Sequence, residues 1–91
     1  MNYDDIILDA LRRYGPMTNG EIVEATGIRS NNVSRSITRL RKFRFVKLVW
    51  GNGRGGSLNY YAIWEFEGKF VPRPFYEDAP WKSSNMGRNG E

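Results

Sequence analysis

The sequence predicts an α+β domain in which three helices precede a two-stranded β-hairpin. Apolar residues recur at helical spacing as far as residue 43, and two runs of β-branched and aromatic residues then flank a glycine-rich segment. The 91 residues suffice for one domain with a modest core. We expect this domain over residues 1–65, an extended aromatic and proline-rich arm over 66–81, and a disordered tail over 82–91.

The first two helices are predicted from their apolar stripes and end signals. The first runs from Tyr3 to Tyr14, with Asn2 as N-cap and Gly15 at the end. Its apolar stripe comprises Tyr3, Ile6, Ile7, Ala10, Leu11 and Tyr14. The second runs from Asn19 to Thr26 and follows a capping-box pattern formed by Thr18 and Glu21. Gly27 is the expected C-cap, and Ile28 is expected to return to the core.

The third helix is predicted over residues 30–43, with Ser30 as its N-cap. Val33, Ile37 and Leu40 form one apolar stripe. The opposite face carries amides, hydroxyls and cations, which are the groups that hydrogen-bond base edges and phosphates. Two helices joined by a short turn that contains glycine form a helix-turn-helix.

After the third helix, residues 45–50 and 58–64 are predicted to be strands. The segment 51–57 holds four glycines and therefore forms the hairpin loop. Trp50 and Trp64 are interpreted as hairpin and core packing rather than as base-stacking residues.

The charges are segregated along a chain whose net charge is +4. Residues 28–64 contain eight cations and no acidic residue, the pattern expected of a surface that binds a polyanion. The chain contains no cysteine and no histidine, which excludes disulfides, thiolate metal sites and histidine-based triads. We therefore expect no catalytic residues, no metal site, no cofactor and no enzymatic activity.

The stretch from Met17 to Arg41 resembles the helix-turn-helix of MarR-type and related prokaryotic regulators, which are winged helix-turn-helix proteins. The positions that match are Glu21, Ile22, Thr26, Gly27, Ile28, Ser30, Val33, Ser34, Arg35, Ile37 and Leu40. The resemblance covers residues 3–64, about two thirds of the chain. The sequence departs from that pattern at Arg44, where a small residue is usual, and at Arg54, which lacks an acidic neighbour. The long dimerisation helices of those regulators are also missing.

The resemblance implies a third helix in the major groove of DNA and a wing, residues 51–57, at the minor groove. Carried over to this chain, the predicted base contacts are Asn31, Asn32, Ser34, Arg35 and Thr38. The predicted phosphate contacts are Arg29, Ser30, Arg39, Lys42 and Lys47. Arg54 is predicted to enter the minor groove.

These features predict a small transcriptional regulator that binds specific double-stranded DNA. Two alternatives stay open, namely an accessory DNA-binding factor for replication or recombination and a winged-helix module that binds another protein. A homodimer through the first helix or the aromatic tail is a further hypothesis. The chain has no apolar run of membrane-spanning length and no signal peptide, so we expect a cytoplasmic protein, associated with the nucleoid or located in the host cytoplasm if viral.

Overall fold

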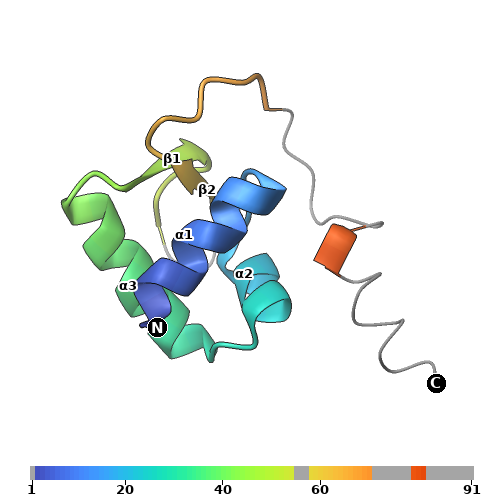
Figure 1. The fold of residues 1–91 in the computed structure, drawn as a ribbon. Coiled ribbons are helices and arrows are strands. Elements are labelled where there is room, and N and C mark those ends of the chain that lie inside the picture. Colours follow the sequence, from blue (N-terminus) through green and yellow to red (C-terminus); the bar gives the residue numbers. More distant parts are fainter. Residues whose placement is uncertain (1, 55–57, 71–78, 82–91) are drawn as a thin grey trace.

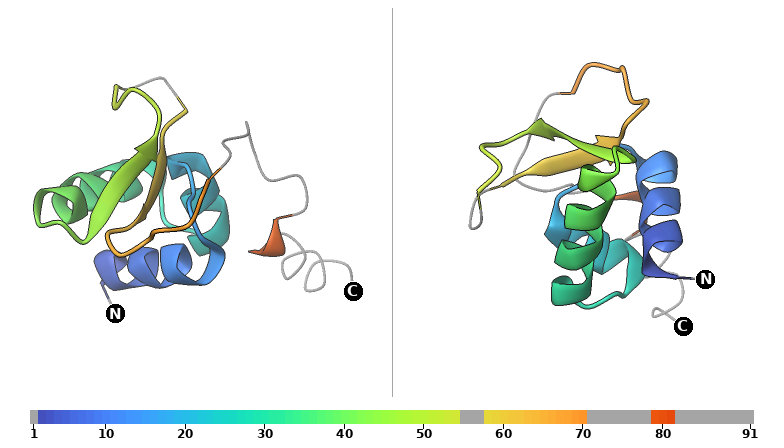
Figure 2. Two further views of the ribbon diagram at one scale, coloured as in Figure 1. Left: turned by 90° about the horizontal axis from the view of Figure 1, so that it is seen from above. Right: turned by 90° about the vertical axis from the view of Figure 1, so that its left-hand side faces the viewer.

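The computed structural model describes residues 2–54, 58–70 and 79–81. The element order is α1 (Tyr3–Tyr14), α2 (Asn19–Thr26), α3 (Ser30–Lys42), β1 (Val46–Trp50) and β2 (Tyr60–Ile63) (Figure 1). The three helices pack on one another, and the antiparallel hairpin β1–β2 packs against α1 and α3 (Figure 2). This arrangement confirms the predicted α+β winged helix-turn-helix fold.

Helix α1 has the predicted bounds because both of the predicted caps, Asn2 and Gly15, are formed. The Asn2 side chain accepts a hydrogen bond from the Asp5 amide at 2.9 Å, and Gly15 ends the helix at φ 86°. Ile7, Ala10 and Leu11 are buried. Tyr3 was predicted to belong to this stripe, but it is 47% exposed because it lies at the first helical position, beyond the edge of the core.

Helix α2 begins with the predicted capping box. The Thr18 hydroxyl accepts from the Glu21 amide at 3.1 Å, and the Glu21 carboxylate accepts from the Thr18 amide at 3.0 Å. Both residues are buried, so the box satisfies backbone donors that water does not reach. The helix ends at Gly27, whose φ of 78° is left-handed, and Ile28 turns back into the core as predicted.

Helix α3 begins differently from the prediction. Arg29, not Ser30, is the N-cap, because Arg29 has an extended backbone whereas Ser30 already lies in the first turn. No side chain caps this end, although the Asn31 side chain accepts from the Asn32 amide at 2.9 Å. The predicted stripe of Val33, Ile37 and Leu40 is buried.

The strands are shorter than predicted, and the hairpin has a third partner. Val46 pairs with Ile63, and the register shifts by one residue between Leu48 and Trp50. Met17 also bridges to Tyr61, with N–H to carbonyl distances of 2.9 and 2.8 Å in the two directions. A single residue gives no period-2 signal, so the sequence did not predict this bridge. It ties the turn before α2 to the inner edge of the hairpin.

Parts of the predicted arm pack on the domain. Phe70 lies against Tyr60 with ring centroids 4.7 Å apart. Trp81, only 3% exposed, meets the Tyr14 ring at 5.1 Å and donates to the Glu24 carboxylate at 2.8 Å. Residues 71–78 and 82–91, which include half of the predicted arm and the whole predicted tail, lie outside the described residues. The predicted domain boundaries stay a prediction.

Candidate nucleic-acid interface

The outer face of α3, defined here as Asn31, Ser34, Arg35 and Thr38, is exposed along the helix. Within the described residues, the side chains of Arg35 and Thr38 form no hydrogen bond or ion pair. The Ser34 hydroxyl accepts from the Asn19 side chain at 3.3 Å, which links α3 to α2. Asn32 is half-buried at the margin of this face. The predicted base-contacting residues therefore share one surface, with Asn32 the least accessible.

The predicted phosphate-contacting residues are separated by the structure into two groups. Arg29, Ser30 and Lys42 are exposed, and Lys47 is half-buried on β1. Arg39 instead forms an ion pair with Asp4 of α1, with Nε–Oδ2 and Nη2–Oδ1 distances of 2.9 and 2.7 Å. Among the eight cations of residues 28–64, Arg39 alone forms an ion pair within the part of the chain that the structure describes.

The Asp4–Arg39 ion pair shifts the pKa of both of its members. The hydrogen bond from Arg39 lowers the pKa of Asp4; partial burial opposes this effect, and a hydrogen bond with Ser36 adds to it. The same hydrogen bond from the guanidinium to Asp4 raises the pKa of Arg39. The pair thus stays ionised near neutral pH and has no net charge, which distinguishes Arg39 from the other predicted phosphate contacts.

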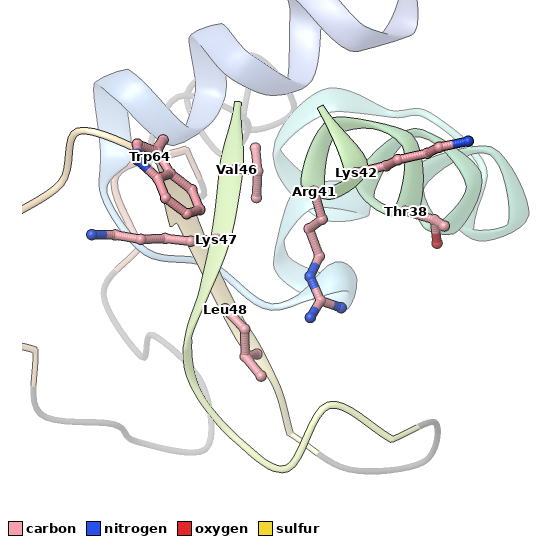
Figure 3. A pocket seen from close by; sticks show the side chains of 7 residues that line it. All are labelled: Thr38, Arg41, Lys42, Val46, Lys47, Leu48 and Trp64. Atoms are coloured by element: carbon pink, nitrogen blue, oxygen red, sulfur yellow. The ribbon is translucent and has the colours of Figure 1, made fainter. Parts of the chain in front are cut away.

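A groove of about 490 Å³ lies between the C-terminal half of α3 and β1 (Figure 3). Figure 3 shows the Arg41 side chain extending between these elements, with Lys42 and Lys47 pointing outward on its two sides. None of these three cations has a carboxylate partner among the described residues. The groove is lined by Thr38, Arg41, Lys42, Val46, Lys47, Leu48 and Trp64. Arg41 was not among the predicted contacts, although its place in the cation-rich segment was the available signal.

The described part of the hairpin loop is held by Asn59. This buried side chain accepts from the Gly53 amide at 3.1 Å and donates to the Arg54 carbonyl at 3.0 Å. Gly51 has φ 119°, and a Cβ there would collide with Asn59. Arg54 is exposed, and its amide donates to the Asn52 side chain at 2.9 Å. Residues 55–57 of the predicted wing lie outside the described residues.

Several aromatic rings expected to be packed are exposed. Trp50 packs within the hairpin as predicted, edge-on against Tyr60 with ring centroids 6.5 Å apart. Core packing is wrong for much of each tryptophan ring, because Trp50 and Trp64 are 48% and 43% exposed. The reason is their position at the ends of the strands, where no helix covers them. Phe43, Phe45 and Trp64, which we call the aromatic cluster, are all exposed near the turn between α3 and β1.

Arg44, the departure from the family pattern, adopts φ 63° in that turn. Left-handed backbone favours glycine over residues with a Cβ, which explains why a small residue is usual there. Its guanidinium lies 5.7 Å from the Trp64 ring centroid.

Comparison with known families agrees with this geometry. Residues 6–47, just under half of the chain, match the model of the family described as "Bacterial regulatory protein, arsR family". The match covers most of α1, all of α2 and α3, and the start of β1. No curated protein matches the chain. Among the described residues, no helix combines the length and apolarity needed to cross a membrane.

Proposed function

Because the chain is a winged helix-turn-helix protein with the DNA-binding module of prokaryotic regulators, we propose that it is a small transcriptional regulator that recognises specific double-stranded DNA. The observation that carries this proposal is the outer face of α3. It presents exposed polar side chains to solvent, and two of them, Arg35 and Thr38, form no hydrogen bond or ion pair among the described residues. The surrounding segment carries cations that, within the described part of the chain, almost all lack acidic partners. We expect the protein to act in the cytoplasm.

In the proposed complex, α3 lies in the major groove, whose width of about 12 Å admits a helix. Arg35 is suited to guanine O6 and N7, and Asn31 to adenine N6 and N7. Ser34 and Thr38 supply hydroxyl groups beside them. The apolar stripe on the opposite side of α3 holds the helix on the domain, so these contacts need no rearrangement of the core.

The proposed phosphate contacts surround this face. Arg29 and Ser30 lie at the N-terminus of α3, where backbone N–H groups also favour an anion. Lys42 and Lys47 lie at the other end, and we add Arg41 because it extends into the groove between them. We leave Arg39 out of this set because Asp4 already occupies its guanidinium.

The wing completes the proposed interface. Arg54 is exposed on the hairpin loop and is proposed to enter the minor groove, whose negative potential attracts arginine. The hydrogen bonds of Asn59 to Gly53 and Arg54 support this placement, since they fix the backbone that carries the side chain.

Selection of binding sites from random-sequence duplexes tests the proposal. The wild-type chain should enrich a defined sequence. Arg35→Ala should relax the preference at one or two positions, whereas Lys42→Ala should weaken binding to all sequences alike. Arg13→Ala is the matched control, because Arg13 is exposed on α1 and pairs with Asp9. If Arg35→Ala and Lys42→Ala acted identically, the proposed base-contacting face would be wrong.

The number of copies on DNA is a separate question. Many such domains bind palindromic sites as two-fold dimers. Of the two predicted dimer surfaces, we favour the first helix, because Trp81 of the aromatic arm is buried against its own chain. Sedimentation of the protein with and without the selected duplex measures the stoichiometry, and a symmetric selected sequence would indicate a dimer.

A further inference from the structure

The aromatic cluster forms an exposed surface that duplex binding by α3 and the wing does not use. Phe43, Phe45 and Trp64 are 61%, 55% and 43% exposed. The Trp64 amide donates to the Phe45 carbonyl at 2.9 Å, so these two residues are direct neighbours across the hairpin. They lie at the end of the hairpin opposite the glycine-rich loop (Figure 2).

Cations lie over two of the three rings of this cluster. Lys42 lies 5.8 Å from the Phe43 ring centroid, and Arg44 and Lys47 lie 5.7 and 5.9 Å from that of Trp64. Trp64 also lines the groove that contains Arg41, Lys42 and Lys47. A groove lined by cations that lack a carboxylate partner among the described residues therefore leads directly to exposed rings.

We propose that the groove and the aromatic cluster bind single-stranded nucleic acid. The cations of the groove neutralise the phosphates of the strand, and the rings of Phe45 and Trp64 stack on its bases. Stacking on a base is stronger than an exposed cation–π contact, so a base displaces Arg44 and Lys47 from the Trp64 ring. The released cations are then available to phosphates of the same strand.

The charge of the surface selects this occupant over a second copy of the chain. Two copies meeting at the aromatic cluster would bring Lys42, Arg44 and Lys47 against their own equivalents, which is unfavourable. Acidic residues near the cluster, Glu65 and Glu67, follow Trp64 in the chain. The strand therefore approaches from the α3 side, where the groove is basic.

The test uses the full chain and two fluorescein-labelled probes, a twelve-nucleotide oligothymidylate and a random-sequence duplex, followed by anisotropy at low salt. Phe45→Ala and Trp64→Ala should each weaken oligothymidylate binding by about tenfold. Both should bind the duplex within about twofold of wild type. Trp50→Ala is the control, because Trp50 is equally exposed at the other end of β1. Circular dichroism verifies that every variant is folded.

Three outcomes would overturn the proposal. The wild-type chain could fail to bind oligothymidylate, or the ring variants could bind it as wild type does, which would reduce the interaction to charge alone. Alternatively, poly-glutamate could bind with the same dependence on Phe45 and Trp64, which would indicate an acidic protein partner. Loss of duplex binding by the wild-type chain would instead contradict the proposed regulator function and leave this surface intact.

Discussion

The Asp4–Arg39 ion pair leads to a quantitative prediction for the salt dependence of DNA binding. Four unpaired cations are proposed to contact phosphates, namely Arg29, Arg41, Lys42 and Lys47. Each neutralised phosphate contributes about −0.9 to the slope of log affinity against log salt concentration, so four give about −3.6. Between 50 and 200 mM salt, duplex affinity should therefore fall about 150-fold. Fluorescence anisotropy of a labelled duplex across this range measures the slope.

Substitutions distinguish the cation that forms an ion pair, Arg39, from those that form none among the described residues. Lys42→Gln should make the slope shallower by about 0.9 and weaken binding about eightfold at 0.1 M salt. The double variant Asp4→Asn/Arg39→Gln removes both members of the pair and keeps the net charge of the chain. It should bind with the wild-type slope and affinity. Asp4→Asn alone releases the Arg39 guanidinium and should steepen the slope by up to about 0.9.

The double variant decides whether the reasoning is right. If it lost as much slope as Lys42→Gln, Arg39 would contact a phosphate in the complex. The neutral pair seen in the structure would then be broken by DNA, and the assignment of phosphate contacts from unpaired cations would fail.

Three further predictions concern stability. Trp81→Ala should lower the free energy of unfolding by about 3–5 kcal/mol, because it removes a buried ring; urea denaturation measures this, and a cost below about 1 kcal/mol would show that the ring does not pack as described. Asn59→Ala should remove two hydrogen bonds worth about 1 kcal/mol each. It should therefore accelerate hydrogen exchange at the Gly53 amide, and unchanged protection would contradict the clamp. The pKa of Asp4 is lowered from 3.8 by folding, so its stabilising effect is complete above pH 3.8 and is lost as the pH falls through its lower native value. The difference in unfolding free energy between wild type and Asp4→Asn should shrink as the pH falls below 3.8, and a difference that stayed constant across the acid range would exclude this linkage.

Local signals allowed much of the fold to be predicted. The bounds of α1 and α2 follow from Asn2, Gly15, the Thr18–Glu21 capping box and Gly27, each acting within four residues of its partner. The N-terminus of α3 was misplaced by one residue because a serine before a helix is usually its cap, whereas here the turn geometry makes Arg29 the cap. The strands were predicted too long because Phe45 and Trp64, whose residue type favours strands, lie beyond the ladder, as do Leu58 and Asn59 at the start of the second predicted strand.

The site was harder to predict, because its supporting contacts join distant parts of the chain. Asp4 and Arg39 are far apart in sequence and meet only once α1 packs on α3. The interaction of Asn59 with Gly53 and Arg54 depends on loop geometry that no periodicity encodes. The exposure of Trp64 was missed for the opposite reason, since tryptophan is highly buried on average and nothing local indicates an uncovered strand end.

The bridge between Met17 and Tyr61 has a mechanical consequence. Its two hydrogen bonds close the chain around α2, α3 and β1, so the helix-turn-helix and the hairpin are fastened at both ends of that span. The bridge therefore restrains relative motion between α3 and the described part of the hairpin, the two parts of the proposed interface. A duplex that binds this interface must therefore adapt its own shape to the protein, by bending or by changing its groove width. Sequences that deform at low energetic cost will consequently be favoured even at base pairs that no side chain contacts.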